Sequence, residues 1–201
     1  MKGMKTVVFV AALALVKVLW AQPTPIPMLE STANQIIATL QQNKAHLKNN
    51  PQLIYQAVEK HLLPNVDVNG MSRSVLGRTA WGQASASEKQ QFSHAFTQLV
   101  IRTYATPLTE YTDETIKFMP IRGSLDSRFI RVNSLIVRSN GKNIPLSYSL
   151  VNQNGQWKIY DLSVEGVSLL QSFHSQFAEA LHNASIQDLI KQMSQHGKKA
   201  A

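Results

Sequence analysis

The hydrophobic pattern of this 201-residue chain changes its period twice. From residue 26 to residue 108, apolar side chains recur every three or four positions, which is the spacing of one helix face. Between residues 115 and 164 they alternate with polar side chains, as in a half-buried strand, and after Gly166 the helical spacing returns. This order of elements, with helices before and after a sheet, predicts one α+β domain over residues 22–194, with a polar tail over residues 195–201.

Helix signals subdivide the two helical regions. Pro51 suits a first helical position, and Ser85 with Glu88 forms a capping box, in which each side chain satisfies an amide donor of the other residue. Pro107 should kink or end the helix that starts there. We expect helices over residues 26–48, 51–63, 68–79, 86–108, 167–181 and 185–193.

The alternating region predicts a four-stranded antiparallel meander. Asn140-Gly141 and Asn154-Gly155 separate alternating runs, and Asn-Gly favours a tight hairpin turn because both central residues need positive φ. In the last strand, Trp157 and Ile159 fall on one face, whereas the apolar residues at 160, 162 and 164 fall on the other. Two alternatives remain: a β-bulge near Asp161, or a strand covered on both faces.

Residues 1–21 have the organisation of a secretory signal. Lys2 and Lys5 precede an apolar stretch over residues 6–16, and Ala21 is the expected last residue before cleavage. The alternative is an uncleaved membrane anchor, but Lys17 interrupts the apolar run short of the ~20 residues that span a bilayer. Cleavage would remove three positive charges and reduce the formal net charge from +8 to +5. We therefore expect an exported protein that is soluble after cleavage.

The sequence offers little catalytic apparatus. It has no cysteine, which excludes disulfides, thiolate metal sites and a cysteine nucleophile, and its six histidines form neither HxxxH nor HExxH. The motifs GxSxG, GxGxxG and GxxxxGK[ST] are absent. Asp161 is the best candidate for acid–base catalysis, its alternative role being a structural hydrogen-bond partner. We expect no cofactor, no metal and no enzymatic activity; an exported enzyme that uses Asp161 is the alternative.

Basic side chains gather in and beside the predicted strands. They are Arg122, Arg128, Arg131, Arg138, Lys142 and Lys158. Two interpretations stay open: a solvated sheet face that protects strand edges, or recognition of an anionic headgroup or partner. The export signal argues against nucleic acid. The abundant apolar residues leave a second choice open, because a filled core and a core divided around a ligand have the same composition.

Short runs spaced along most of the chain resemble the MlaC family of periplasmic phospholipid-binding proteins, which includes the toluene-tolerance proteins. The resemblance covers about residues 35–193. It is carried by residues 73–78, 88–92, 95–96, 99–105, 144–146, 148, 155–161, 164–169 and 175–178.

This resemblance implies a helix-wrapped sheet that holds a phospholipid by its acyl chains, with the headgroup near solvent. It also implies that a periplasmic monomer shuttles lipid between an outer-membrane lipoprotein–porin complex and an inner-membrane ABC transporter with an MCE-domain component. That shuttling would maintain the lipid asymmetry of the outer membrane. A pocket for two acyl chains would approach ~1,000 Å³.

We expect the lipid to contact apolar residues of the long central helix, the last two strands and the helix that follows them. These candidates are Leu76, Phe96, Leu99, Val100, Tyr104, Tyr148, Leu150, Trp157, Ile159, Val164, Val167, Phe173 and Phe177.

Overall fold

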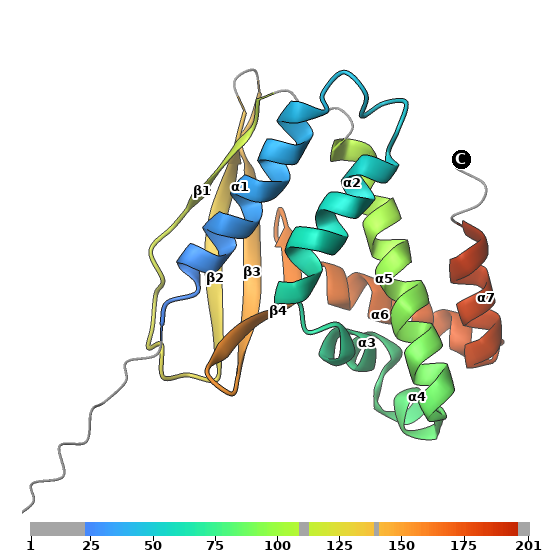
Figure 1. Ribbon diagram of the computed structural model, residues 1–201. Helices are drawn as coiled ribbons and strands as arrows, with labels where there is room; N and C mark the ends of the chain where they lie inside the picture. Colours follow the sequence, from blue (N-terminus) through green and yellow to red (C-terminus); the bar gives the residue numbers. More distant parts are fainter. Residues whose placement is uncertain (1–22, 109–112, 139–140, 197–201) are drawn as a thin grey trace, which may run out of the picture.

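The computed structural model describes residues 23–108, 113–138 and 141–196 and consists of two halves (Figure 1). In one half, helix α1 (Ile26–Gln42) lies across an antiparallel sheet. The other half is a group of helices beside the sheet, and α2 (Gln52–Ala57) leads the chain from α1 towards it. The α+β class predicted from the change of hydrophobic period is confirmed.

The sheet is an antiparallel meander whose strands pair in chain order. The strands are β1 (Thr115–Phe118), β2 (Phe129–Val137), β3 (Ile144–Gln153), β4 (Gln156–Val164) and β5 (Val167–Ser168). Asn154 and Gly155 have φ of 54° and 84°, which confirms the tight turn predicted between β3 and β4. Asn140, of the other Asn-Gly pair, lies outside the described residues. Strand β5 is additional to the four expected, because Glu165 (φ 49°) and Gly166 (φ 86°) turn the chain back onto β4.

A β-bulge in β4 resolves the conflict in its side-chain pattern. Ser149 of β3 is paired with Asp161, but the next residue, Leu150, is paired with Ile159, so Tyr160 is the extra residue. The bulge alternative is therefore confirmed. Because the extra residue shifts the alternation by one position, Ile159 and Leu162 face the same side of the sheet.

The helices differ from expectation mainly at their ends. After α2 come a π turn η1 (Val58–Leu62), a 3₁₀ turn η2 (Leu63–Asn65), α3 (Val68–Leu76), α4 (Arg78–Gln83), α5 (Ala86–Leu108), α6 (Leu169–Leu181) and α7 (Ile186–His196). The helix expected to reach residue 48 ends at Gln42, because the Asn43 side-chain amide donates to the Thr39 carbonyl at 2.8 Å and completes the last turn. Helix α7 continues three residues beyond its expected end at residue 193.

One of the expected helices is divided into two in the structure. The helix expected over residues 68–79 breaks at Gly77, whose φ of 81° and ψ of 160° lie in a region essentially restricted to glycine. Helix α3 begins at Val68 and is capped by Asp67, whose carboxylate accepts from the Gly70 amide at 3.0 Å.

The predicted capping box is confirmed at the start of α5. The Ser85 amide donates to the Glu88 carboxylate at 2.9 Å, and the Glu88 amide donates to the Ser85 hydroxyl at 3.2 Å. The Ser85 amide and the Ser85 hydroxyl, which donates at 2.8 Å, both bond the Glu88 carboxylate and lower its pKa. Ser185 and Asp188 repeat the arrangement at α7. The Ser185 hydroxyl and amide donate to the Asp188 carboxylate at 2.6 Å and 3.1 Å and lower its pKa, and the Asp188 amide donates to the Ser185 hydroxyl at 3.1 Å.

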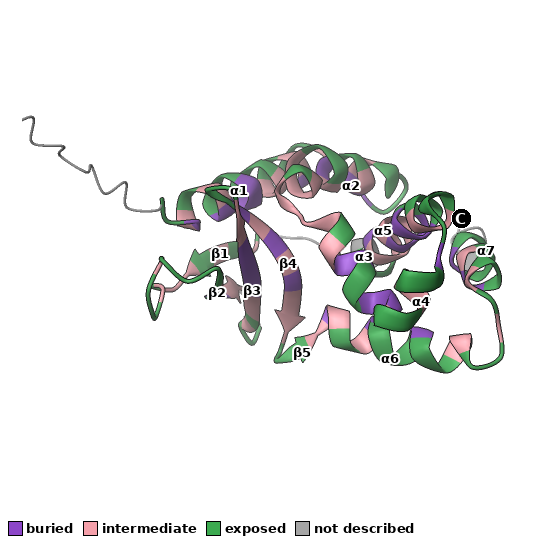
Figure 2. Cartoon of the chain, turned by 90° about the horizontal axis from the view of Figure 1, so that it is seen from below, coloured by how far each residue is buried: buried purple, intermediate pink, exposed green. Residues whose placement is uncertain are grey.

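Two apolar clusters dominate the interior. The helical core comprises buried side chains of α3, α5, α6 and α7, and the sheet core comprises buried side chains of α1, β2, β3 and β4. Figure 2 shows the buried stretches of β3 and β4 beside α1, and separate buried stretches among the helices. No helix of the described ranges has both the length and the apolar character needed to cross a bilayer.

Candidate functional site

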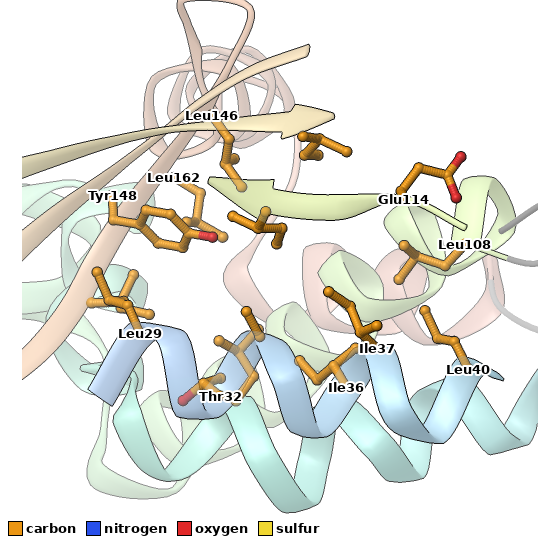
Figure 3. A pocket seen from close by; sticks show the side chains of 15 residues that line it. Leu29, Thr32, Ile36, Ile37, Leu40, Leu108, Glu114, Leu146, Tyr148 and Leu162 are labelled. Atoms are coloured by element: carbon orange, nitrogen blue, oxygen red, sulfur yellow. The ribbon is translucent and has the colours of Figure 1, made fainter. Parts of the chain in front are cut away.

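A pocket of about 200 Å³ lies between α1 and the face of the sheet that α1 covers (Figure 3). Helix α1 supplies one wall through Leu29, Thr32, Ala33, Ile36, Ile37 and Leu40. The strands supply the other through Ile116, Ile136, Leu146, Tyr148, Ile159 and Leu162. Leu62 of η1, Leu108 of α5 and Glu114, next to β1, complete the lining.

The wall on α1 follows from helical periodicity. The spacing 29, 32–33, 36–37, 40 places all six side chains on one stripe of the helix. Leu29 and Leu40 are each 2% exposed, whereas Ile36 and Ile37 between them are only half-buried. Ile36 and Ile37 thus face the pocket and also pack against the buried cluster of Leu40, Leu47 and Ile54.

The wall on the sheet follows from strand alternation and from the bulge. Leu146 and Tyr148 are two residues apart on β3, and Ile116 is paired with Ile136 across β1 and β2. Without the extra residue Tyr160, Ile159 and Leu162 would face opposite sides. The bulge therefore directs one more apolar side chain into the pocket.

Few polar groups reach the pocket. The Thr32 hydroxyl accepts from the Asn65 side-chain amide at 2.9 Å. Burial raises the pKa of Tyr148 to about 12, so its hydroxyl stays neutral near neutral pH. Glu114 is the only charged residue in the lining described. Such a pocket is suited to hydrocarbon and provides no acid–base pair.

Asp161, the residue considered for catalysis, has a structural role. Its carboxylate accepts from the Ser168 hydroxyl at 2.6 Å and from the Leu170 amide at 3.1 Å, and thereby joins β4 to the start of α6. It does not line the pocket. Within the described ranges, no group of three or more His, Asp or Glu side chains is arranged to hold a metal ion.

The candidate lipid-contacting residues predicted from sequence are dispersed in the structure. Tyr148 and Ile159 line the pocket, and Leu150 and Trp157 pack beside them in the sheet core. Leu76, Phe96, Phe173 and Phe177 are buried in the helical core, and Leu99 and Val100 pack against it. Val164 is half-buried at the end of β4, whereas Tyr104 and Val167 are 38% and 61% exposed.

Sequence reasoning did not single out the other lining residues, although their signals were present. The apolar stripe of residues 26–48 and the alternation of Ile116, Leu146 and Leu162 were visible in the sequence. Their aliphatic side chains form a thinner pattern than the aromatic residues of α5 and α6, which drew the prediction towards the helical core.

Comparison with known proteins identifies the family. A family model described as MlaC protein matches residues 30–195. The chain belongs to the MlaC family. A toluene tolerance protein of Pseudomonas putida is 30% identical over 174 residues, covering 87% of this chain and 80% of that protein. The intermembrane phospholipid transport system binding protein MlaC of Haemophilus influenzae is 28% identical over 178 residues, covering 87% and 83% of the two chains.

A solved structure shares the fold. The phospholipid-binding protein of Ralstonia solanacearum, determined in complex with a phospholipid, superposes with a TM-score of 0.79 at 25% identity. The match covers 86% of this chain and 96% of that one. The family resemblance recognised in the sequence is thus confirmed, and the relatives are named for phospholipid binding and transport, not for catalysis.

Proposed function

We propose that this protein is a periplasmic phospholipid carrier that holds acyl chains between α1 and the sheet. The observation that carries the proposal is the aliphatic pocket of that interface, in a chain of the MlaC family whose solved relative was determined with a phospholipid. Its route runs between an outer-membrane lipoprotein–porin complex and an inner-membrane ABC transporter with an MCE-domain component. In this role it maintains the lipid asymmetry of the outer membrane.

The energetics favour a carrier. At ~0.8 kcal/mol per methylene, two acyl chains with ~30 methylenes represent roughly 24 kcal/mol of hydrophobic transfer, so a free lipid does not cross an aqueous compartment. A carrier needs only to match the apolar environment of the bilayer, because the lipid passes from bilayer to pocket without entering water. The sequence has no GxxxxGK[ST] phosphate loop, so energy coupling belongs to the transporter.

Lipid entry requires the pocket to become larger. The pocket of about 200 Å³ is roughly one-fifth of the ~1,000 Å³ expected for two acyl chains. At ~24 cal/mol per Å³, a rigid cavity of 1,000 Å³ would cost on the order of 20 kcal/mol, more than the 5–15 kcal/mol stability of a typical domain. A cavity of the observed size costs only about 5 kcal/mol. A wall that separates as lipid enters avoids the larger cost.

Export is part of the proposal. We assign residues 1–21, which lie outside the described residues, to a cleaved secretory signal, residues 22–194 to the lipid-binding domain and residues 195–201 to a polar tail. The Trp157 indole N–H donates to the Pro23 carbonyl at 2.7 Å, so the fold engages the chain two residues after Ala21, the expected cleavage site.

Native mass spectrometry of the protein isolated from periplasm, without detergent, tests the carrier function. We expect the mature chain to carry phospholipid, and the delipidated protein to take up phospholipid from vesicles. Folded protein that neither carries lipid from the cell nor acquires it from vesicles would refute the proposal.

A further inference from the structure

We propose that Glu114 and Arg138 form a headgroup site at the end of the pocket, which selects zwitterionic phospholipids with a primary ammonium group over anionic ones. This inference rests on the proposed carrier function. Arg138 Nε lies 3.7 Å from Glu114 Oε1, so a carboxylate and a guanidinium stand side by side next to an otherwise uncharged lining.

Strand register places the Glu114 carboxylate at the end of the apolar wall. Ile116 is paired with Ile136, and both line the pocket. Glu114 lies just before β1 and Arg138 just after β2, each two residues beyond this pair, and Glu114 also lines the pocket. Arg138 lies outside the lining, and its guanidinium stands beside the Glu114 carboxylate. The ion pair therefore lies about 7 Å beyond the last residue pair of the apolar wall.

The ion pair stands at one end of the pocket and is partly open to solvent. Figure 3 shows Leu29 and Tyr148 at the end opposite Glu114 and Leu108. Leu29 and Tyr148 are 2% and 7% exposed, and Leu40, at the Leu108 end, is also 2% exposed. The Glu114 side chain is 16% exposed and that of Arg138 is 43% exposed. Acyl chains along the apolar lining would thus leave the polar end of the lipid beside the two charges.

The chemistry of the pair matches one class of headgroup. A phosphoethanolamine headgroup carries a phosphate and an ammonium ion, which complement Arg138 and Glu114 respectively. A phosphoglycerol headgroup offers only the phosphate and leaves the Glu114 carboxylate facing a like charge. A partly exposed ion pair is weak, so a headgroup that supplies both charges can compete with it.

Uptake from mixed vesicles tests the site. Delipidated protein is incubated with vesicles of equal phosphatidylethanolamine and phosphatidylglycerol that carry identical acyl chains, and bound lipids are quantified by mass spectrometry. We expect the wild type to enrich phosphatidylethanolamine and Glu114→Gln to lower the bound ratio of the two lipids about threefold. Glu179→Gln, on the exposed surface of α6, should keep the wild-type ratio.

Arg138 has a matched control on its own strand. Arg138→Gln should reduce the uptake of both lipids, whereas Arg131→Gln, an odd-numbered position on the opposite face of β2, should not. Equal ratios for wild type and Glu114→Gln, with normal total uptake, would overturn the headgroup site and leave the carrier function standing. Wild-type protein that takes up neither lipid would overturn both.

Discussion

The helical core and the sheet core use their apolar side chains differently. In the helical core, Phe92, Phe96, Phe173 and Phe177 form ring contacts with centroids 5.4–6.0 Å apart and fill the space between the helices. In the sheet half, aliphatic residues of α1 face the strands across a pocket of about 200 Å³. The helical half is therefore filled by its own side chains, whereas in our proposal the half containing α1 binds the lipid.

The largest expected effect is a loss of stability caused by a substitution in the helical half. Phe96 is 2% exposed and contacts three other phenylalanine rings, so Phe96→Ala should lower the free energy of unfolding by about 3–5 kcal/mol. Urea denaturation measures the loss. Lipid bound per folded molecule should stay near the wild-type value; loss of lipid from protein that is still folded would mean that the two halves are not separate in function.

The next effect concerns the pocket wall. Ile37→Glu places a carboxylate against the acyl chains and should reduce lipid loading at least about tenfold, while the free energy of unfolding falls by only about 1–2 kcal/mol. Ala38→Glu adds the same charge to the exposed side of α1 and serves as the control. Equal loading of the two variants would contradict the assignment of this wall to lipid.

A smaller effect concerns the attachment of the N-terminal segment to the sheet. Trp157→Phe removes the indole donor to the Pro23 carbonyl and part of a side chain buried in the sheet core, and should lower the free energy of unfolding by at least about 1 kcal/mol, as measured in urea. Trp81→Phe, which keeps an aromatic ring beneath Lys89, should change it by less than about 0.5 kcal/mol. A cost at Trp81 equal to that at Trp157 would show that this hydrogen bond contributes nothing.

The smallest effect is a pH dependence that belongs to the helical half. The capping bonds lower the pKa of Glu88 and of Asp188. The stabilisation that these two carboxylates give the folded state is therefore complete above their ordinary pKa values of 4.5 and 3.8, and it is lost as pH falls through their lowered pKa values. Amide exchange measured between pH 5 and pH 3 should show the first turns of α5 and α7 opening before the sheet. In Glu88→Gln the response at α5 should be absent; an unchanged response would assign it to other groups.

Local chemistry made most of the fold predictable. The Ser85–Glu88 box, the Asn154-Gly155 turn and the two changes of hydrophobic period each act within a few residues, and each was confirmed. The break at Gly77 was missed because a glycine that permits a left-handed backbone does not require one. Strand β5 was missed because a strand of two residues is too short to show an alternating hydrophobic pattern.

The pocket was less predictable for a physical reason. Hydrophobicity shows that a side chain leaves water, but not whether protein or ligand covers it. The phenylalanines of the helical core and the isoleucines of α1 both appear in the sequence as apolar helix stripes, and only the arrangement of α1 over the sheet shows which of them face a pocket. The bulge was foreseen as one of two alternatives, since only pairing with β3 decides which side Ile159 faces.

Photo-crosslinking with a phospholipid that carries a diazirine on its acyl chain tests the central claim most directly. After uptake from vesicles and irradiation, peptide mass spectrometry should place the adducts on α1, between Leu29 and Leu40, and on strand residues such as Ile116 and Leu146. Adducts concentrated on Phe96, Phe173 or Phe177 would instead place the acyl chains among the helices and contradict the account.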